Sequence, residues 1–193
     1  MIYLKIKPLL AVQFIFILIC SGIAAAEGGG NKTDKENQNR TLMSHADMIS
    51  SEKDFLTEMI EHHQEAVDTS VLLFVSTEDP ELRKLAESIY TTRSNEVLEM
   101  RMFYARLYNL IPTGARYRPL MSDLNAESGK ERDVHYLLNM IVHHRAAVDM
   151  AEKVLSLHGI HIETMKFAKN MIKRQMAEIG LMEQWLEKAG ALM

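Results

Sequence analysis

The sequence predicts an all-α protein in which two repeated helical hairpins form a four-helix bundle. The first observation is a repeated decapeptide, since MIEHHQEAVD from Met59 to Asp68 recurs as MIVHHRAAVD from Met140 to Asp149. The second is that apolar residues recur at spacings of three and four, the period of an amphipathic helix. The third is that no convincing alternation of the kind expected for strands is found. Because a single hairpin leaves its apolar stripe exposed, the two repeats are expected to pack on each other.

Residues 1–26 are predicted to be a secretory signal peptide. Lys5 and Lys7 precede a short apolar run, and the alanines at 24–26 form the A-x-A pattern that signal peptidase accepts. The apolar run is too short to span a bilayer comfortably. We therefore expect an exported protein, periplasmic or secreted, that starts at Glu27 and has no stable membrane insertion after cleavage. An uncleaved membrane anchor is the alternative.

The composition excludes some classes of partner and bond. The chain has 22 basic and 26 acidic residues, a net charge of −4 that argues against nucleic acid as a partner. Its one cysteine, Cys20, lies in the predicted signal, so the exported protein forms no disulfide and offers no thiolate. Methionine and histidine are abundant instead, with 14 and 8 residues.

The first hairpin is expected to cover residues 51–109. A Gly-rich, charged stretch without aromatic residues comes before it, and residues 27–49 are therefore predicted to form a flexible leader. The helical pattern starts at Ser51, and a second helix starts at Asp79-Pro80, which supplies a cap and a proline at the first helical position. The prolines and the glycine in NLIPTGARYRP end it.

The second hairpin is expected to cover residues 131–189, which places the whole bundle at 50–190. Its first helix is predicted from about Glu131 to Leu157, where His158-Gly159 ends it, and its second from about Ile162 to Lys188. The connection between the hairpins is long enough for a simple up-and-down bundle or for a ferritin-type crossover, and the sequence leaves both open.

Each repeat carries Met-x-x-His-His in its first helix. Adjacent helical residues point about 100° apart, so both histidines can border the same inner face. His62 lies one turn after Met59, and His143 one turn after Met140, which puts a thioether beside an imidazole. The second repeat adds Met150 to this line, where the first has a threonine.

The helical rise predicts which residues of the second helices lie at the same height. At about 1.5 Å per residue, Glu96 and Met100 reach the level of the first His pair, and Glu178 and Met182 that of the second. Each repeat should therefore assemble Met, His, His and Glu or Met near the middle of the bundle. The candidate metal ligands are Met59, His62, His63, Met100, Met140, His143, His144, Met150 and Met182.

This residue set favours copper. Burial of four imidazoles without partners is costly, and a bound metal ion removes that cost. Thioethers bind Cu(I) well and Zn, Mg or Ca poorly, so methionine and histidine without cysteine favour Cu(I) over Cu(II). The sequence MSHADM places Met43, His45 and Met48 together in the leader as a second candidate copper site. We expect copper sequestration, tolerance or delivery to another copper-handling protein, without catalysis.

Two alternatives remain open. The histidines could form a metal-free polar core in a structural or interaction module, oriented by Asp68, Glu96, Asp149 and Glu178. A ferritin-type di-iron enzyme would instead need Glu-x-x-His on two helices. Methionine stands three residues before His62 and His143, where that motif requires glutamate, which makes the di-iron alternative the weaker one.

The motifs resemble those of domain-of-unknown-function family 305. DFLTEMIEHHQEAVD, NMIVHHRAAVDMA and RQMAEIGLMEQWL are similar to its Met-x-x-His-His-x-x-Ala-x-x-Met-Ala and Gln-x-x-Glu-Ile-x-x-Met-x-x-Trp patterns. The resemblance covers residues 51–189 and implies a ferritin-like fold and an extracytoplasmic, CopM-type role in copper tolerance through the same Met and His residues. The first repeat departs from the patterns at Thr69, Arg93 and Phe103, which favours the second repeat as the better site.

Overall fold

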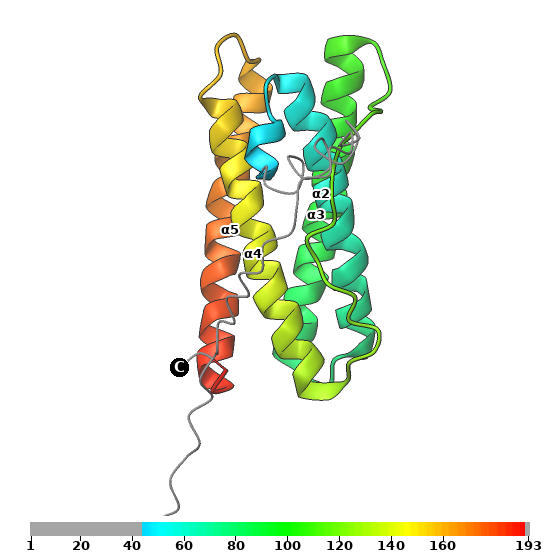
Figure 1. Ribbon diagram of the computed structural model, residues 1–193, viewed down its shortest axis with the longest axis vertical. Helices are drawn as coiled ribbons and strands as arrows, with labels where there is room; N and C mark the ends of the chain where they lie inside the picture. The colour runs from blue at the N-terminus through cyan, green and yellow to red at the C-terminus, as the bar shows by residue number, and fades with distance from the viewer. Residues whose placement is uncertain (1–43, 192–193) are drawn as a thin grey trace, which may run out of the picture.

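The structure is a computed structural model that describes residues 44–191, and within them it is an all-α four-helix bundle (Figure 1). Its elements are a short 3-10 helix, η1 (His45–Met48), and the helices α2 (Glu52–Ser76), α3 (Pro80–Tyr108), α4 (Gly129–Leu155) and α5 (Ile162–Lys188). The predicted fold class is confirmed. No helix among residues 44–191 is long and apolar enough to cross a membrane. The predicted signal peptide lies outside the described residues.

Local chemistry sets the ends of the helices in the first hairpin. The Ser51 hydroxyl accepts a hydrogen bond from the Asp54 N–H and caps α2. The Asp79 carboxylate accepts from two backbone N–H groups at the start of α3, and Pro80 takes the first helical position. Asn109, at φ 52°, ends α3 in the left-handed region that asparagine tolerates.

The bundle has a crossover topology. In Figure 1, α2 runs down and α3 runs back up, and α4 then also runs up, so that α4 is parallel to α3 and antiparallel to α2. The loop of residues 109–128 must therefore travel the length of the bundle before α4 begins. Of the two topologies that the sequence leaves open, the structure has the crossover.

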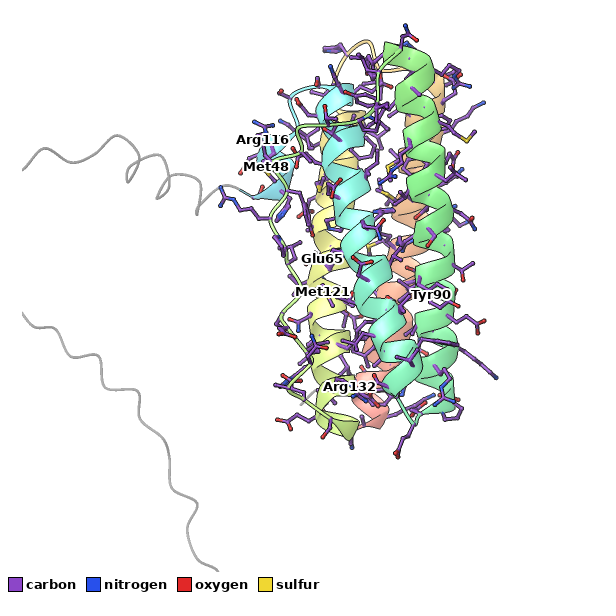
Figure 2. The ribbon with its side chains drawn as sticks, turned by 90° about the vertical axis from the view of Figure 1, so that its right-hand side faces the viewer. Met48, Glu65, Tyr90, Arg116, Met121 and Arg132 are labelled. Atoms are coloured by element: carbon purple, nitrogen blue, oxygen red, sulfur yellow. The ribbon has the colours of Figure 1, made fainter. Side chains whose placement is uncertain are left out.

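The crossover loop is fastened to α2 and to the segment before it. The Arg116 N–H donates to Glu58, and its guanidinium donates to the Met48 carbonyl, both at 2.7 Å. Further along, the Glu65 carboxylate accepts from the N–H groups of Leu120 and Met121, each at 3.0 Å. Figure 2 shows Arg116 beside Met48 and Met121 beside Glu65.

The start of the described chain differs from the predicted flexible leader. Residues 44–49 form a capped 3-10 turn that contacts α4, with Met48 and Ile49 buried. The physical reason is apolar burial, since Ile49 joins the core at one end of the bundle.

A polar layer divides the core into two apolar clusters. The cluster at the η1 end contains Ile49, Phe55, Leu56, Met59, Ile60, Val97, Met100, Tyr104, Ala147, Met150, Ala151, Val154, Phe167, Ala168 and Met171. The cluster at the other end contains Ala66, Leu73, Leu82, Ala86, Ile89, Leu124, Tyr136, Leu137, Met140, Ile141, Ile179, Met182 and Leu186. The repeated His-His pairs occupy the layer between them.

The cap of α3 can be tested by Asp79→Ala. This change removes the acceptor for the Glu81 and Leu82 N–H groups and the contact with the Trp185 indole N–H. We expect urea unfolding followed by circular dichroism to show a loss of about 1–2 kcal/mol in unfolding free energy. Asp68→Ala, an exposed position in α2, is the control and should change little. An unchanged Asp79→Ala midpoint would contradict the role of the cap.

Candidate metal site

Four histidines form the middle layer of the bundle. His62, His63, His143 and His144 are each at most 1% exposed. The outer pair, His62 and His143, lies next to Glu65 and the crossover loop. The inner pair, His63 and His144, faces α3 and α5. The two pairs have very different partners.

Each inner histidine is hydrogen-bonded to the glutamate expected at its height. His63 Nε2 lies 3.0 Å from Glu96 Oε2, and His144 Nε2 lies 2.7 Å from Glu178 Oε2. Burial alone would raise the pKa of Glu96, but the hydrogen bond from His63 and the nearby positive charges hold it well below its usual range. Because both glutamates are ionised, Nε2 of each ring is the donor. The Nδ1 atoms of both rings are buried and have no hydrogen-bond partner.

Arg93 joins the two His–Glu pairs. Its Nη1 donates to Glu96 Oε2 at 2.8 Å, and its Nη2 contacts Glu178 and lies 3.3 Å from His144 Nε2. Arg93 is 1% exposed, so this guanidinium is one of the most deeply buried charges in the described chain. A second arginine, Arg174, also donates to Glu96 but is 42% exposed.

The outer histidines stack on each other without hydrogen bonds. The ring centroids of His62 and His143 are 3.6 Å apart, with the ring planes tilted by 38°. Neither nitrogen of either ring has a hydrogen-bond partner. His143 Nε2 does come within 3.2 Å of Glu65 Oε2, but without the alignment of a hydrogen bond. The outer pair therefore presents unused ring nitrogens inside the protein.

Two groups outside the bundle core adjoin the outer pair. The Tyr117 ring, from the crossover loop, lies 5.6 Å from the His62 ring, and its hydroxyl donates to Glu65. His45, from η1, lies 6.3 Å from His62 and 5.3 Å from Tyr117, and its Nε2 donates to the Arg118 carbonyl. His45 is partly exposed, so it lies between the buried pair and the surface.

All four layer histidines are held neutral. Burial lowers the pKa of each, and for His62 the neighbouring His143 adds to that effect. For His144, burial outweighs the hydrogen bond to Glu178 and lowers the pKa to about 4. Neutral imidazole is the form that binds metal ions. The buried, unpartnered nitrogens therefore fit the requirements of a metal ligand.

The predicted methionine ligands form two groups, one on each side of the histidine layer. Met59, Met100 and Met150 lie in the cluster at the η1 end, and Met140 and Met182 lie in the other, all at 0% exposure. Met150 of the second repeat therefore lies with Met59 and Met100, on the opposite side of the histidine layer from Met140 and Met182. The reason is that α4 is antiparallel to α2, so residues after His144 rise to the level of residues before His62.

The remaining predicted residues are placed as follows. His45 and Met48 lie in η1, whereas Met43 lies outside the described residues. Asp68 and Asp149, expected to orient the imidazoles in the polar-core alternative, are exposed. Glu96 and Glu178 do orient the inner pair.

Three residues of the site were not predicted from the sequence. Glu65, one turn after His62, could have been found from helical spacing. Arg93 is visible in the sequence as a departure from the repeat, but its position between both glutamates is not. Tyr117 lies in the crossover loop, and no sequence signal places it there.

The ligand chemistry restricts what this layer can hold. Among residues 44–191, no three His, Cys, Asp or Glu side chains are arranged so that they could hold one metal ion. A site that uses the outer imidazoles would therefore draw on the methionine thioethers on either side of the layer, which suit a soft ion.

The fold and the layer together define a helical-bundle protein with buried histidine pairs repeated in two hairpins. The chain belongs to the DUF305 family, a domain of unknown function, whose model matches residues 22–110 and 111–186. No curated relative matches it.

Several solved structures are similar. CopM in its Cu(II)-bound form is 28% identical, with a TM-score of 0.66 over 73% of this chain and 99% of CopM. The Cu(I)-bound form is 29% identical, with a TM-score of 0.64 over 72% and 98% of the two chains. A DUF305 protein from Streptomyces coelicolor, described as a candidate secreted protein, is 30% identical, with a TM-score of 0.64 over 77% and 94%.

The lowered histidine pKa values predict acid sensitivity. A histidine with a native pKa below its unfolded value of 6.5 stabilises the fold fully above pH 6.5 and loses that contribution as the pH falls towards its native pKa, about 4 for His144. Each such group contributes a slope of about 1.4 kcal/mol per pH unit in this window.

Urea unfolding at several pH values checks this dependence. The variant His144→Gln should show a shallower loss between pH 6.5 and about 4, because one titrating group is removed. His158→Gln, an exposed position after α4, should keep the slope of the unaltered protein. Equal slopes in all three proteins would contradict the assignment of His144 as a buried neutral group.

Proposed function

We propose that this protein is exported and binds copper, with Cu(I) preferred, for sequestration, tolerance or delivery to another copper-handling protein. The observation that carries the proposal is the outer pair, in which two buried neutral imidazoles stack and no ring nitrogen has a hydrogen-bond partner. Buried polar atoms are normally hydrogen-bonded, and a bound ion removes the cost of leaving these unpaired. The ligand candidates in the bundle are Met59, His62, His63, Met100, Met140, His143, His144, Met150 and Met182.

The donor chemistry supports a soft ion. Buried thioethers lie on both sides of the layer, and the one cysteine lies within the predicted signal at Cys20. Thioether and imidazole together favour Cu(I) over hard ions. The solved structures of CopM with Cu(I), Cu(II) and silver add support, because they are similar in fold and about 30% identical in sequence.

The leader supplies a second proposed copper site, made of Met43, His45 and Met48. His45 is partly exposed and lies 6.3 Å from His62, which favours a route between the surface and the outer pair. A copper ion held at His45 would lie close to the buried layer without entering it.

A metal-free structural or interaction module is the second candidate. It is favoured by the inner pair, because His63 and His144 already have carboxylate partners and need no ion. Measurements of Cu(I) binding by the unaltered protein and its variants separate the two functions.

The outer pair can be tested by anaerobic Cu(I) titration against a chromogenic chelator. We expect the double variant His62→Ala, His143→Ala to bind at least about tenfold more weakly than the unaltered protein, because both imidazole ligands are lost. His135→Ala, an exposed residue of α4, is the matched control, and circular dichroism verifies the fold. Unchanged affinity would remove the site assignment, and no binding by the unaltered protein at micromolar copper would favour the metal-free module.

The methionines can be tested without opening cavities, since Met→Leu nearly conserves volume and costs less than about 1.5 kcal/mol. One variant replaces Met140 and Met182, and another replaces Met59, Met100 and Met150. We expect at least one set to weaken Cu(I) binding and to shift the sulfur–copper signal in X-ray absorption. Met176→Leu, an exposed position of α5, is the control. If both variants bind Cu(I) as tightly as the unaltered protein does, thioether ligation in the bundle is excluded.

A further inference from the structure

Three metal-binding atoms of the inner layer lie beside the Arg93 guanidinium, and a fourth lies next to one of them. Glu96 Oε2 accepts from Nη1 at 2.8 Å, Glu178 Oε2 contacts Nη2, and His144 Nε2 lies 3.3 Å from Nη2. His63 Nε2 completes the group, 3.0 Å from Glu96 Oε2. All of these side chains except Glu178, at 13%, are at most 4% exposed.

Two imidazoles and two carboxylates are a donor set that suits Zn²⁺, Co²⁺ and similar divalent ions. Donor atoms on a tetrahedral ion with bonds of about 2.1 Å lie about 3.4 Å apart. The His63–Glu96 and His144–Glu178 separations, 3.0 and 2.7 Å, need only small movements to reach that value. A neutral imidazole can place its proton on Nδ1, which frees Nε2 for a metal.

We infer that Arg93 is a specificity-determining residue that keeps divalent cations out of this inner cluster. Its fixed positive charge already pairs with both carboxylates that a divalent ion would need as ligands. A divalent ion would have to displace a buried guanidinium and meet its charge at short range in a medium of low polarity. Three of the donors lie along the guanidinium instead of converging on one point, which agrees with the lack of a three-ligand site of His, Cys, Asp or Glu among residues 44–191.

The internal repeat supports this reading. The residue equivalent to Arg93 in the second repeat is Gln175, which is also buried, at 1% exposure. Glutamine at both positions would leave the two glutamates without a buried counter-charge and open to a cation. Because Arg93 contacts both glutamates, this one arginine of the first repeat supplies the counter-charge for both. In terms of the proposed function, Arg93 keeps divalent ions away from the two glutamates and leaves binding to the neutral imidazole and thioether donors, which favour soft ions.

Arg93→Gln tests the inference with CoCl₂ as the probe, in the absence of copper. We expect the variant to gain the intense visible absorption of four-coordinate Co(II) at one ion per chain, with affinity about 100-fold or more above that of the unaltered protein. Cobalt should also raise its thermal midpoint, because the ion binds only the folded state. The unaltered protein should show neither effect. Arg174→Gln is the matched control, since it too removes an arginine from Glu96 but lies outside the cluster.

Arg93→Gln with Glu178→Gln is the second variant, because it removes one charge of each sign and keeps His63, Glu96 and His144 as ligands. Cobalt binding by either variant supports the inference. If both variants are helical but bind no cobalt, the inference is overturned. It is also overturned if both remain unfolded in saturating cobalt, because the bound ion should replace the charge of the arginine. Cobalt absorption in the unaltered protein that disappears with His144→Ala overturns it too. Failure of Cu(I) binding would remove the proposed function and leave the cobalt result interpretable.

Discussion

The buried ion network around Arg93 is the interaction on which the middle of the bundle depends. A guanidinium removed from water is tolerated only with close carboxylate partners, and breaking such a pair commonly costs about 3–5 kcal/mol. Here the partners come from both hairpins, Glu96 on α3 and Glu178 on α5. Glu96 also bonds to His63 on α2, and Glu178 to His144 on α4. One network thus fixes the height of all four helices, and a helix shifted by one turn would leave a charge unpaired.

This network makes the two halves of the histidine layer unequal. The inner imidazoles are positioned by carboxylates, so their Nε2 atoms are satisfied. The outer imidazoles lie under the crossover loop and have no hydrogen-bond partner at any ring nitrogen. Since folded proteins rarely leave buried polar atoms unpaired, and tend to do so at functional sites, the outer pair is where function is expected. The Nε2 atoms of the inner pair already have a structural role, because they hold the two glutamates of the network.

The sequence predicts more of the fold than of the site. Caps at Ser51 and Asp79 and the helical period place the helices closely, and the rise per residue correctly brings Glu96 and Glu178 level with the histidines. Helix caps, the helical period and the rise per residue all depend on positions along a single helix. The crossover is not predictable in this way, because a long loop permits either direction for α4. The grouping of Met150 with the methionines of the first repeat depends on that direction, so it could not be predicted either.

Charge balance supports the proposed preference of the outer site for a monovalent ion. Glu65 contacts the outer pair, with its Oε2 3.2 Å from His143 Nε2. Burial would raise its pKa, but contacts with His143, Tyr117 and the loop N–H groups lower it to about 2, so it carries a full negative charge at neutral pH. The imidazoles and thioethers are neutral and add no charge to the site. One negative charge balances Cu(I), whereas Cu(II) would leave one positive charge uncompensated in the core, where desolvation is expensive. Softness and charge therefore support the same proposal, and the crossover loop has a part in it because its N–H groups hold the Glu65 carboxylate in place.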